Sequence, residues 1–178
     1  MKTFIKFSFI FFCVLCIASC ATKKSVAPPS RYNSQTVAKL SMQFGVRLTQ
    51  ADNIKLYQAC SGWLGVKYRY GGNTKKGIDC SGLATIIYRQ VYGIAIERNT
   101  ANILNKNCVP IVRNNLHEGD LVFFRTNGST NSRIPTHLGI YLKNGKFIHA
   151  SSSKGVIVSN LSETYYVRNW LTGGKVKK

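Results

Sequence analysis

A cysteine and two histidines are the residues of this sequence best suited to chemistry. Cys80 stands in the run Asp79-Cys80-Ser81-Gly82-Leu83, after a glycine-rich segment and at the start of an apolar one. His137 and His149 follow far downstream, in two short β-rich runs joined by Lys143-Asn144-Gly145. A thiol is nucleophilic only as the thiolate, so a thiol with an imidazole base beside it can attack a carbonyl carbon.

The order of these residues predicts a role for each. A helix that begins at Cys80 would place the thiol at the partial positive charge and unpaired N–H groups of a helix N-terminus, and a nearby imidazolium would favour the thiolate further. The N–H groups near residues 80–82 could also stabilise an oxyanion. His137 fits the base that takes and returns the proton, and His149 fits the group that orients this base. The pattern favours a cysteine peptidase.

The turn between the two histidine-bearing runs decides whether the histidines can meet. With Asn144-Gly145 as a two-residue turn, His149 would face Ile140 and His137 would point to the other face of the sheet. With Lys143-Asn144-Gly145 as a three-residue loop and Gly145 in a left-handed bulge position, His149 faces Gly139 and His137 lies diagonally on the same face. We predict the second register, and Gly139 would then leave space over the sheet.

The elements that carry these residues change character along the chain. Helices are predicted from Ser34 to Phe44, from an N-cap at Thr49 with Asp52 three residues later, and from Cys80, with Asp79 as N-cap, to Gly93. Short β-rich runs follow, separated by Gly, Asn and Ser; they are 120–125, 138–142, 146–150 and 156–159. Helices first and an antiparallel sheet afterwards predict an α+β fold, with N-terminal helices packed on a small sheet.

Composition limits the class of protein. The 178 residues suffice for one domain, and the net charge of +19 favours polyanionic partners such as nucleic acid, anionic lipid or an anionic wall polymer. The positive residues are scattered, with no block longer than a pair, which argues against a dedicated nucleic-acid patch. A merely solvated basic surface is the plain alternative.

The N-terminus has the pattern of an export signal. Two lysines are followed by an apolar run from Phe7 to Ala18, too short to span a bilayer comfortably, and Ile17-Ala18-Ser19-Cys20 is typical of a bacterial lipoprotein cleavage site. We expect a signal peptide at 1–19, lipidation of Cys20, a flexible tether over 20–33 and one domain over 34–178. An ordinary signal peptide with an incidental cysteine is the alternative.

The remaining cysteines bear on disulfides and metals. Beyond Cys20 the chain has Cys60, Cys80 and Cys108, an odd number for an exported protein, so at least one thiol is free or pairs between molecules. A Cys60–Cys108 disulfide is possible and stays open at this point. No spacing matches a zinc ligand set, and no metal site or cofactor is predicted.

Five blocks of the sequence resemble the NlpC-type cell-wall cysteine peptidases, and the lipoprotein murein endopeptidases among them especially. The resemblance covers roughly residues 54–170. The blocks, in order, are Gly65-Val66-Lys67-Tyr68-Arg69-Tyr70-Gly71-Gly72, Gly77-Ile78-Asp79-Cys80-Ser81-Gly82, Gly119-Asp120-Leu121-Val122-Phe123-Phe124, His137-Leu138-Gly139-Ile140-Tyr141 and Phe147-Ile148-His149-Ala150.

This resemblance implies a papain-like α+β fold and a set of site residues. It implies Cys80 as nucleophile, His137 as base and His149 as third polar residue. Tyr68 matches the family's tyrosine near the oxyanion site. Asp79, Ser81 and Arg98 are predicted to contribute to the oxyanion or substrate site, since Arg98 and Thr100 resemble a Pro-Arg-Ser/Thr segment. Glu97, Asn99 and Glu118 depart from the family's usual residues, which puts substrate fit and loops in doubt but leaves the catalytic positions intact.

The sequence and the resemblance together predict a lipid-anchored peptidoglycan endopeptidase. The diaminopimelate–D-Ala cross-link is favoured over the γ-D-Glu–diaminopimelate bond. The expected setting is the bacterial cell envelope, anchored through Cys20 to the outer membrane and facing the periplasm, as a monomer without nucleic-acid partners. The alternatives are a non-catalytic wall-binding lipoprotein and a related amidase or acyltransferase with similar chemistry.

Overall fold

The computed structural model describes residues 32–126 and 133–177 of the chain. The elements are α1 (Ser34–Phe44), α2 (Ile54–Ser61), β1 (Asn73–Thr74), β2 (Gly77–Ile78), α3 (Cys80–Tyr92), α4 (Thr100–Asn102), the π-helical segment η1 (Ile103–Asn107), β3 (Cys108–Ile111), the 3₁₀ segment η2 (Arg113–Asn115), β4 (Leu121–Phe124), β5 (His137–Tyr141), β6 (Lys146–Ser151), β7 (Gly155–Asn160), α5 (Thr164–Asn169) and β8 (Trp170–Val176). The expected signal segment 1–19, Cys20 and most of the tether 20–33 lie outside the described residues. Within these two ranges, the helices are all too short or too polar to cross a bilayer.

The N-terminal helices confirm one predicted boundary and correct another. Helix α1 ends where predicted, with Gly45 in the left-handed conformation (φ 62°) after Phe44. Helix α2 begins at Ile54 rather than after Thr49, because the Asn53 side chain accepts the hydrogen bond from the Leu56 N–H at 3.2 Å. The Asp52 carboxylate is already committed to the Thr49 N–H at 2.6 Å, which closes a turn before the helix.

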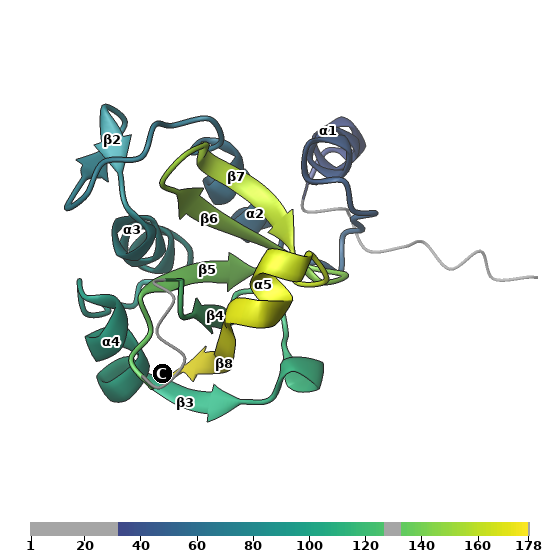
Figure 1. Ribbon diagram of the computed structural model, residues 1–178. Helices are drawn as coiled ribbons and strands as arrows, with labels where there is room; N and C mark the ends of the chain where they lie inside the picture. Colours follow the sequence, from purple (N-terminus) through teal and green to yellow (C-terminus); the bar gives the residue numbers. More distant parts are fainter. Residues whose placement is uncertain (1–31, 127–132, 178) are drawn as a thin grey trace, which may run out of the picture.

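The larger of two sheets holds six antiparallel strands in the order β3-β8-β4-β5-β6-β7 (Figure 1). The four predicted strands are present, whereas β3, β8 and α5 were not predicted. Pro110 in β3 and the Gly173-Gly174 pair in β8 weaken the strand signal there. Yet the glycines fit this place, since a Cβ on Gly174 would lie 2.7 Å from the Phe123 ring.

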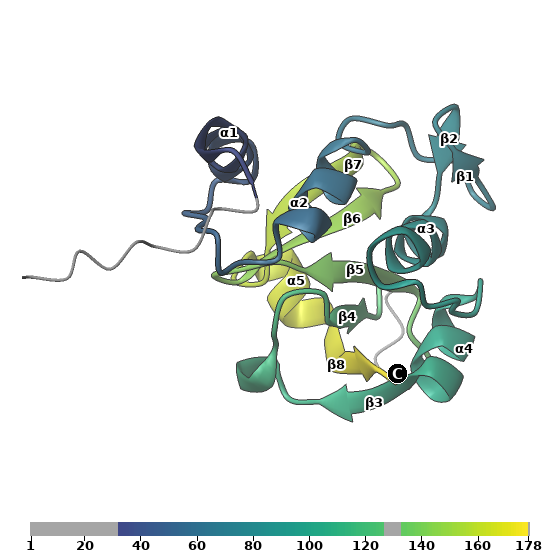
Figure 2. The ribbon, with the colours of Figure 1, turned by 180° about the vertical axis from the view of Figure 1, so that it is seen from behind.

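Helices cover both faces of this sheet, with α2 and α3 on one side and α5 on the other (Figures 1 and 2). The main core joins α1, α2 and α3 to the sheet through side chains such as Leu83, Phe123 and Ile148. A smaller core beneath α5 contains Val122, Phe124, Phe147, Leu161 and Tyr166. Alternate residues of β4 therefore enter different cores. The α+β prediction is confirmed, and the sequence had not indicated the second core.

The β5–β6 hairpin has the predicted register but reaches it by a different turn. Ile140 pairs with Ile148, so that His149 comes opposite Gly139. Both Asn144 (φ 55°) and Gly145 (φ 75°) adopt the left-handed conformation, which is a primed two-residue turn closed by the Lys146 N–H on the Lys143 carbonyl. The extra residue is Lys143, because the Leu142 N–H also bonds to the Lys146 carbonyl.

Candidate active site

Helix α3 presents Cys80 at its first position, as predicted. The Asp79 side chain caps the helix by accepting the Gly82 N–H at 2.7 Å. The Cys80 residue is 9 % exposed, and its sulfur lies 3.8 Å from the Thr100 hydroxyl oxygen. The backbone N–H of Leu138, the residue after His137, is near enough to lower the pKa of this thiol. The thiol therefore lies between the start of α3, the start of α4 and strand β5.

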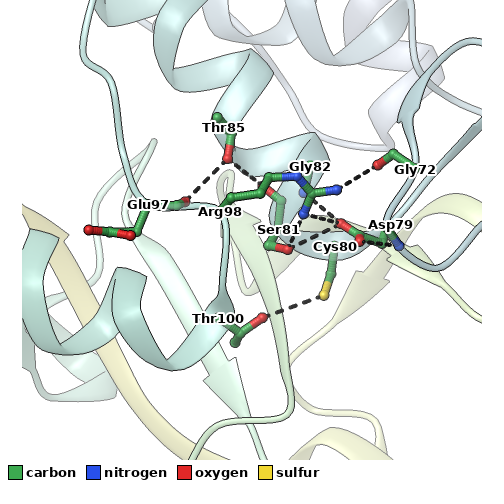
Figure 3. Close-up of polar contacts among 10 residues, drawn as sticks. Gly72, Asp79, Cys80, Ser81, Gly82, Thr85, Glu97, Arg98 and Thr100 are labelled. Carbon is green, nitrogen blue, oxygen red and sulfur yellow. Dashed lines mark hydrogen bonds and ion pairs between the residues drawn. The ribbon is translucent and has the colours of Figure 1, made fainter.

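Asp79, Ser81 and Arg98 form one polar cluster beside the thiol (Figure 3). The Arg98 guanidinium donates to the Asp79 carboxylate at 2.7 Å, to the Ser81 hydroxyl and to the Gly72 carbonyl at 2.8 Å. The second Asp79 oxygen accepts the Gly71 N–H at 2.8 Å. Burial alone would raise the pKa of Asp79, but Arg98 and the Gly82 N–H hold that pKa below its ordinary value. This cluster joins the glycine-rich turn to the start of α3.

Gly82 is required by the close approach of the turn to the helix. A Cβ at this position would lie 2.5 Å from the Gly72 carbonyl oxygen and 2.9 Å from an Arg98 guanidinium nitrogen. Gly72 is itself crowded, because its Cβ would lie 2.5 Å from the Gly77 carbonyl oxygen. The glycines thus allow the turn-rich segment to pack tightly against Gly82, two residues after the thiol.

The two predicted histidines form a hydrogen-bonded pair on one face of the sheet. His137 Nε2 lies 2.9 Å from His149 Nδ1, with the rings nearly perpendicular at 85°. The His149 ring also stacks on Phe147, two residues earlier in β6, with ring centroids 5.0 Å apart. Because His137 uses Nε2 toward His149, its Nδ1 is the nitrogen left for a proton from Cys80.

Two further residues contact this pair and were not predicted from the sequence. The other ring nitrogen of His149, Nε2, lies 3.1 Å from the Ser159 hydroxyl and 3.0 Å from the Tyr166 hydroxyl. Ser159 could have been found from the predicted strand over 156–159, since its partner Phe147 shares a face with His149. Tyr166 gave no such signal, because α5 itself was not predicted.

Burial sets the protonation states of the site. It raises the pKa of the Cys80 thiol, against the opposing effect of the Leu138 N–H and the Thr100 hydroxyl. It lowers the pKa of His137 to about 4 and, together with the neighbouring His137, that of His149 to about 3. Burial therefore disfavours the expected imidazolium beside the thiol, because transfer out of water raises the free energy of both charged rings. These pKa directions favour a neutral thiol and a neutral imidazole in the resting site.

A groove passes on both sides of the Cys80 thiol. It has two lobes, of about 400 and 310 Å³, which share Tyr68, Tyr70, Cys80 and Thr136 as lining residues. The first lobe contains Asp79, Ser81 and Arg98, and the second contains His137 and His149. Tyr68 is thus placed beside Cys80, and burial, with the nearby Cys80 and Asp79, raises the pKa of its hydroxyl. All the predicted site residues within the described ranges border one groove.

The other cysteines and the acidic residues form no second centre in the described part of the chain. Cys60 and Cys108 are buried free thiols, so the disulfide left open by the sequence is not formed. Over residues 32–126 and 133–177, no group of three or more His, Cys, Asp or Glu side chains could hold a metal ion.

Comparison with known proteins places these features in a family. The NlpC/P60 family matches residues 65–175. The chain is 44 % identical over 110 residues to the murein DD-endopeptidase MepS/murein LD-carboxypeptidase of Escherichia coli (strain K12), covering 61 % of this chain and 54 % of that protein. It is 35 % identical over 165 residues to the probable endopeptidase NlpC of the same organism, covering 93 % and 96 %.

Solved structures agree with the fold. An NlpC/P60 family protein from Bacillus cereus ATCC 10987 superimposes with a TM-score of 0.62 at 25 % identity, over 69 % of this chain and 39 % of that one. The papain-like α+β fold is thereby confirmed. The chain spans about half the length of the E. coli protein MepS, 54 %.

Proposed function

Because this chain belongs to the NlpC/P60 family, we propose that it is a peptidoglycan endopeptidase with Cys80 as its nucleophile. The observation that carries the proposal is the placement of Cys80 at the start of α3, on the same groove as the hydrogen-bonded His137–His149 pair. Names of relatives support the substrate, since one is a murein DD-endopeptidase. We assign Cys80 as nucleophile, His137 as base and His149 as the residue that orients His137.

The proposed reaction begins from the neutral pair. As the Cys80 sulfur attacks the carbonyl carbon, His137 Nδ1 takes the thiol proton, and the carbonyl oxygen becomes an oxyanion. We assign the N–H groups at the start of α3 and the Tyr68 hydroxyl as donors to this oxyanion. His137 then returns the proton to the amine nitrogen as the C–N bond breaks, leaving a thioester on Cys80. A water molecule, deprotonated by His137, hydrolyses the thioester and restores the thiol. The reaction needs no cofactor.

The position of His137 determines which side of the substrate lies in each lobe of the groove. Because His137 must protonate the departing amine, the amine-side product belongs in the lobe that contains His137 and His149. The acyl side of the substrate then occupies the lobe beside Asp79, Ser81 and Arg98. The Arg98 and Asp79 charges are paired with one another, so we assign this cluster to shaping the acyl lobe.

The proposed bond is the diaminopimelate–D-Ala cross-link. Support comes from the name of the relative MepS, a murein DD-endopeptidase, and the γ-D-Glu–diaminopimelate bond is the second candidate. The net charge of +19 suits an anionic wall polymer.

We also propose the cellular setting predicted from the sequence. Residues 1–19 would be a signal peptide, Cys20 the lipidated residue, and 34–178 the peptidase domain, tethered through 20–33. The protein would act as a monomer in the bacterial cell envelope, at the outer membrane and facing the periplasm. Metabolic labelling with an alkyne-bearing fatty acid tests the anchor, because label should be present on the wild-type chain and absent from Cys20→Ala.

Digestion of purified sacculi tests the activity. The full chain in detergent is compared with Cys80→Ala, and the products are identified by mass spectrometry. Conversion of cross-linked dimers to monomers by the wild type alone is the expected result, and shortened stems would indicate the γ-D-Glu bond. Absence of any product from a folded wild-type chain would contradict the proposal. Retention on sacculi would then favour a wall-binding module, and turnover of a simple amide would favour an amidase or acyltransferase.

A further inference from the structure

The far side of the His149 ring contacts two hydroxyl groups from different elements. Ser159 lies on β7 and Tyr166 on α5, and their oxygens lie 3.1 and 3.0 Å from His149 Nε2. The two hydroxyls are also hydrogen-bonded to each other at 3.2 Å. Both residues are 7 % exposed. One imidazole nitrogen thus faces His137. The other faces Ser159, whose hydroxyl donates its proton to Tyr166 and so leaves its own oxygen to accept a hydrogen bond from His149 Nε2.

The direction of these hydrogen bonds decides whether His137 can act as a base. His137 Nδ1 can take a proton from Cys80 only if the ring carries its own proton on Nε2, which then donates to His149 Nδ1. His149 Nδ1 must therefore be unprotonated, and the His149 proton must lie on Nε2. In the opposite arrangement His149 Nδ1 donates to His137 Nε2, the His137 proton moves to Nδ1, and that nitrogen cannot accept from the thiol.

We propose that Ser159 and Tyr166 are positioning residues that hold His149 in the Nε2–H tautomer and so keep His137 Nδ1 free to accept a proton. The inference rests on the proposed function, since it concerns the same histidine pair. The two hydroxyl oxygens accept the Nε2–H, and either one suffices to satisfy it. Both hydroxyls would act through His149.

Packing fixes the Tyr166 hydroxyl in this position. The Tyr166 ring contacts Phe147 edge to face, with centroids 4.8 Å apart, and also contacts Phe124 at 5.2 Å. Both phenylalanines belong to the small core beneath α5. The second core therefore has a consequence for the site, because it holds the tyrosine against the histidine that orients the base.

The surroundings of the His149 ring leave these hydroxyls as the groups that set its tautomer. Apart from them, the described contacts of the ring are His137 on β5 and Phe147 on β6. None of the four groups carries a formal charge near neutral pH, since burial lowers the pKa of His137 to about 4 and raises that of Tyr166. The choice between tautomers is thus made by hydrogen-bond acceptors and not by an ion pair.

Nitrogen-15 NMR of the histidine side chains is the direct test. The full chain in detergent is labelled in histidine, and long-range nitrogen–proton spectra are recorded at pH 7 for the wild type, Ser159→Ala, Tyr166→Phe and the double variant. We expect the Nε2–H tautomer for both rings in the wild type and in each single variant, which keeps one acceptor. The double variant should show mixed tautomers at His149 and at His137. An unchanged Nε2–H tautomer in the double variant would overturn the inference.

Kinetics supply a second readout, with a matched control. The double variant should lose about tenfold in kcat for murein cleavage, with little change in KM, because a proton is misplaced while the groove is intact. Tyr88→Phe is the control, since it also removes a buried tyrosine hydroxyl, which donates to the Gly119 carbonyl and not to a histidine. An equal loss in Tyr88→Phe would assign the effect to weakened folding and contradict a positioning role.

Alkylation separates this inference from the proposed activity. The rate at which iodoacetamide modifies Cys80 reports proton transfer from the thiol without any murein substrate. A wild type that cuts no murein, yet loses Cys80 alkylation rate in the double variant, would refute the endopeptidase and keep the positioning role. If the wild type cuts murein and the double variant cuts it equally fast, the endopeptidase proposal stands and the positioning role is refuted. If the double variant unfolds, the wild-type spectrum still decides, because an Nδ1–H tautomer at His149 would overturn the inference.

Discussion

Gly139 lies against His149 across the β5–β6 pair, and a Cβ on the glycine would lie 3.2 Å from the His149 Cβ. The same Cβ would lie 2.6 Å from the Phe147 ring and 2.9 Å from the Ile148 carbonyl oxygen. No side chain fits there without displacing the strand that carries His149. The absent side chain thus gives the two imidazoles room to approach to 2.9 Å.

Gly139→Ala should therefore disable the site more than it harms the fold. The methyl group would push on Phe147 and on the β6 backbone, at an overpacking cost of about 1–3 kcal/mol. Because displacement of a catalytic group by about 1 Å can cost about 100-fold in rate, we expect a loss of that order in murein cleavage.

Gly62→Ala is the matched control for this substitution. Gly62 has φ −65°, and its Cβ would meet nothing nearer than 3.7 Å. Chemical denaturation and sacculus digestion of the two variants provide the comparison. Near-wild-type activity in Gly139→Ala would show that the histidine pair tolerates a wider separation than the geometry implies.

The candidate site was predictable from the sequence to the extent that its residues lie in local patterns. Asp79 before Cys80 is a helix N-cap, and the register that joins His137 to His149 follows from strand alternation and a short turn. The left-handed Gly145 is as predicted. The left-handed conformation of Asn144 was not predicted as well, because an Asn-Gly pair can form a primed turn and leave the bulge to the preceding residue.

The parts that the sequence did not predict depend on distant contacts. Strand β8 contains Gly173 and Gly174, which weaken its strand signal, and their value becomes apparent only beside Ile111 and Phe123. Helix α5 is 6 residues long, and in the described structure only Tyr166 among its side chains is buried. So short a helix is stabilised by tertiary packing, which no local pattern reveals.

Arg98→Lys should loosen the start of α3. The guanidinium makes three hydrogen bonds in a fixed geometry, to Asp79, Ser81 and Gly72, that a lysine ammonium cannot reproduce. Since the Arg98 side chain is 39 % exposed, solvent screens the charge, and we expect a loss of only about 1 kcal/mol in the free energy of unfolding. Arg89→Lys on the exposed side of the same helix is the control, and equal midpoints for the two variants in urea would contradict this role.

The contribution of the Asp79 carboxylate to the free energy of unfolding should decrease at acid pH. Its pKa in the folded chain lies below its ordinary value, chiefly because Arg98 and the Gly82 N–H outweigh the effect of burial. A carboxyl group whose pKa is lower in the folded than in the unfolded chain stabilises the fold fully at pH values above its unfolded-state pKa, about 3.9. This stabilisation is lost as the pH falls through the folded-state pKa. The free energy by which the wild type exceeds Asp79→Asn should therefore shrink below about pH 4. A difference that stays constant down to about pH 2 would show that Asp79 gains nothing from ionisation.

Tyr68→Phe tests the hydroxyl beside the thiol. If this hydroxyl donates to the oxyanion, its removal should lower kcat by about 100-fold and leave KM within about threefold, because the bond strengthens only in the transition state. Tyr70→Phe, whose side chain is exposed at the same rim, separates loss of a donor from loss of a rim hydroxyl. A rise in KM with unchanged kcat would instead assign Tyr68 to substrate binding.

The rate of Cys80 alkylation should rise through neutral pH and not reach its plateau there. Burial raises the pKa of this thiol, so the reactive thiolate is scarce at pH 7 and increases as the pH rises. The buried Cys108, whose pKa is raised to about 12, and Cys60, raised further, serve as internal controls and should remain unmodified in the folded chain. Peptide mapping after iodoacetamide treatment between about pH 5 and 9 measures all three thiols together. A Cys80 rate that is already maximal near pH 6 would mean that the resting site holds a thiolate–imidazolium pair, contrary to the neutral pair inferred from burial.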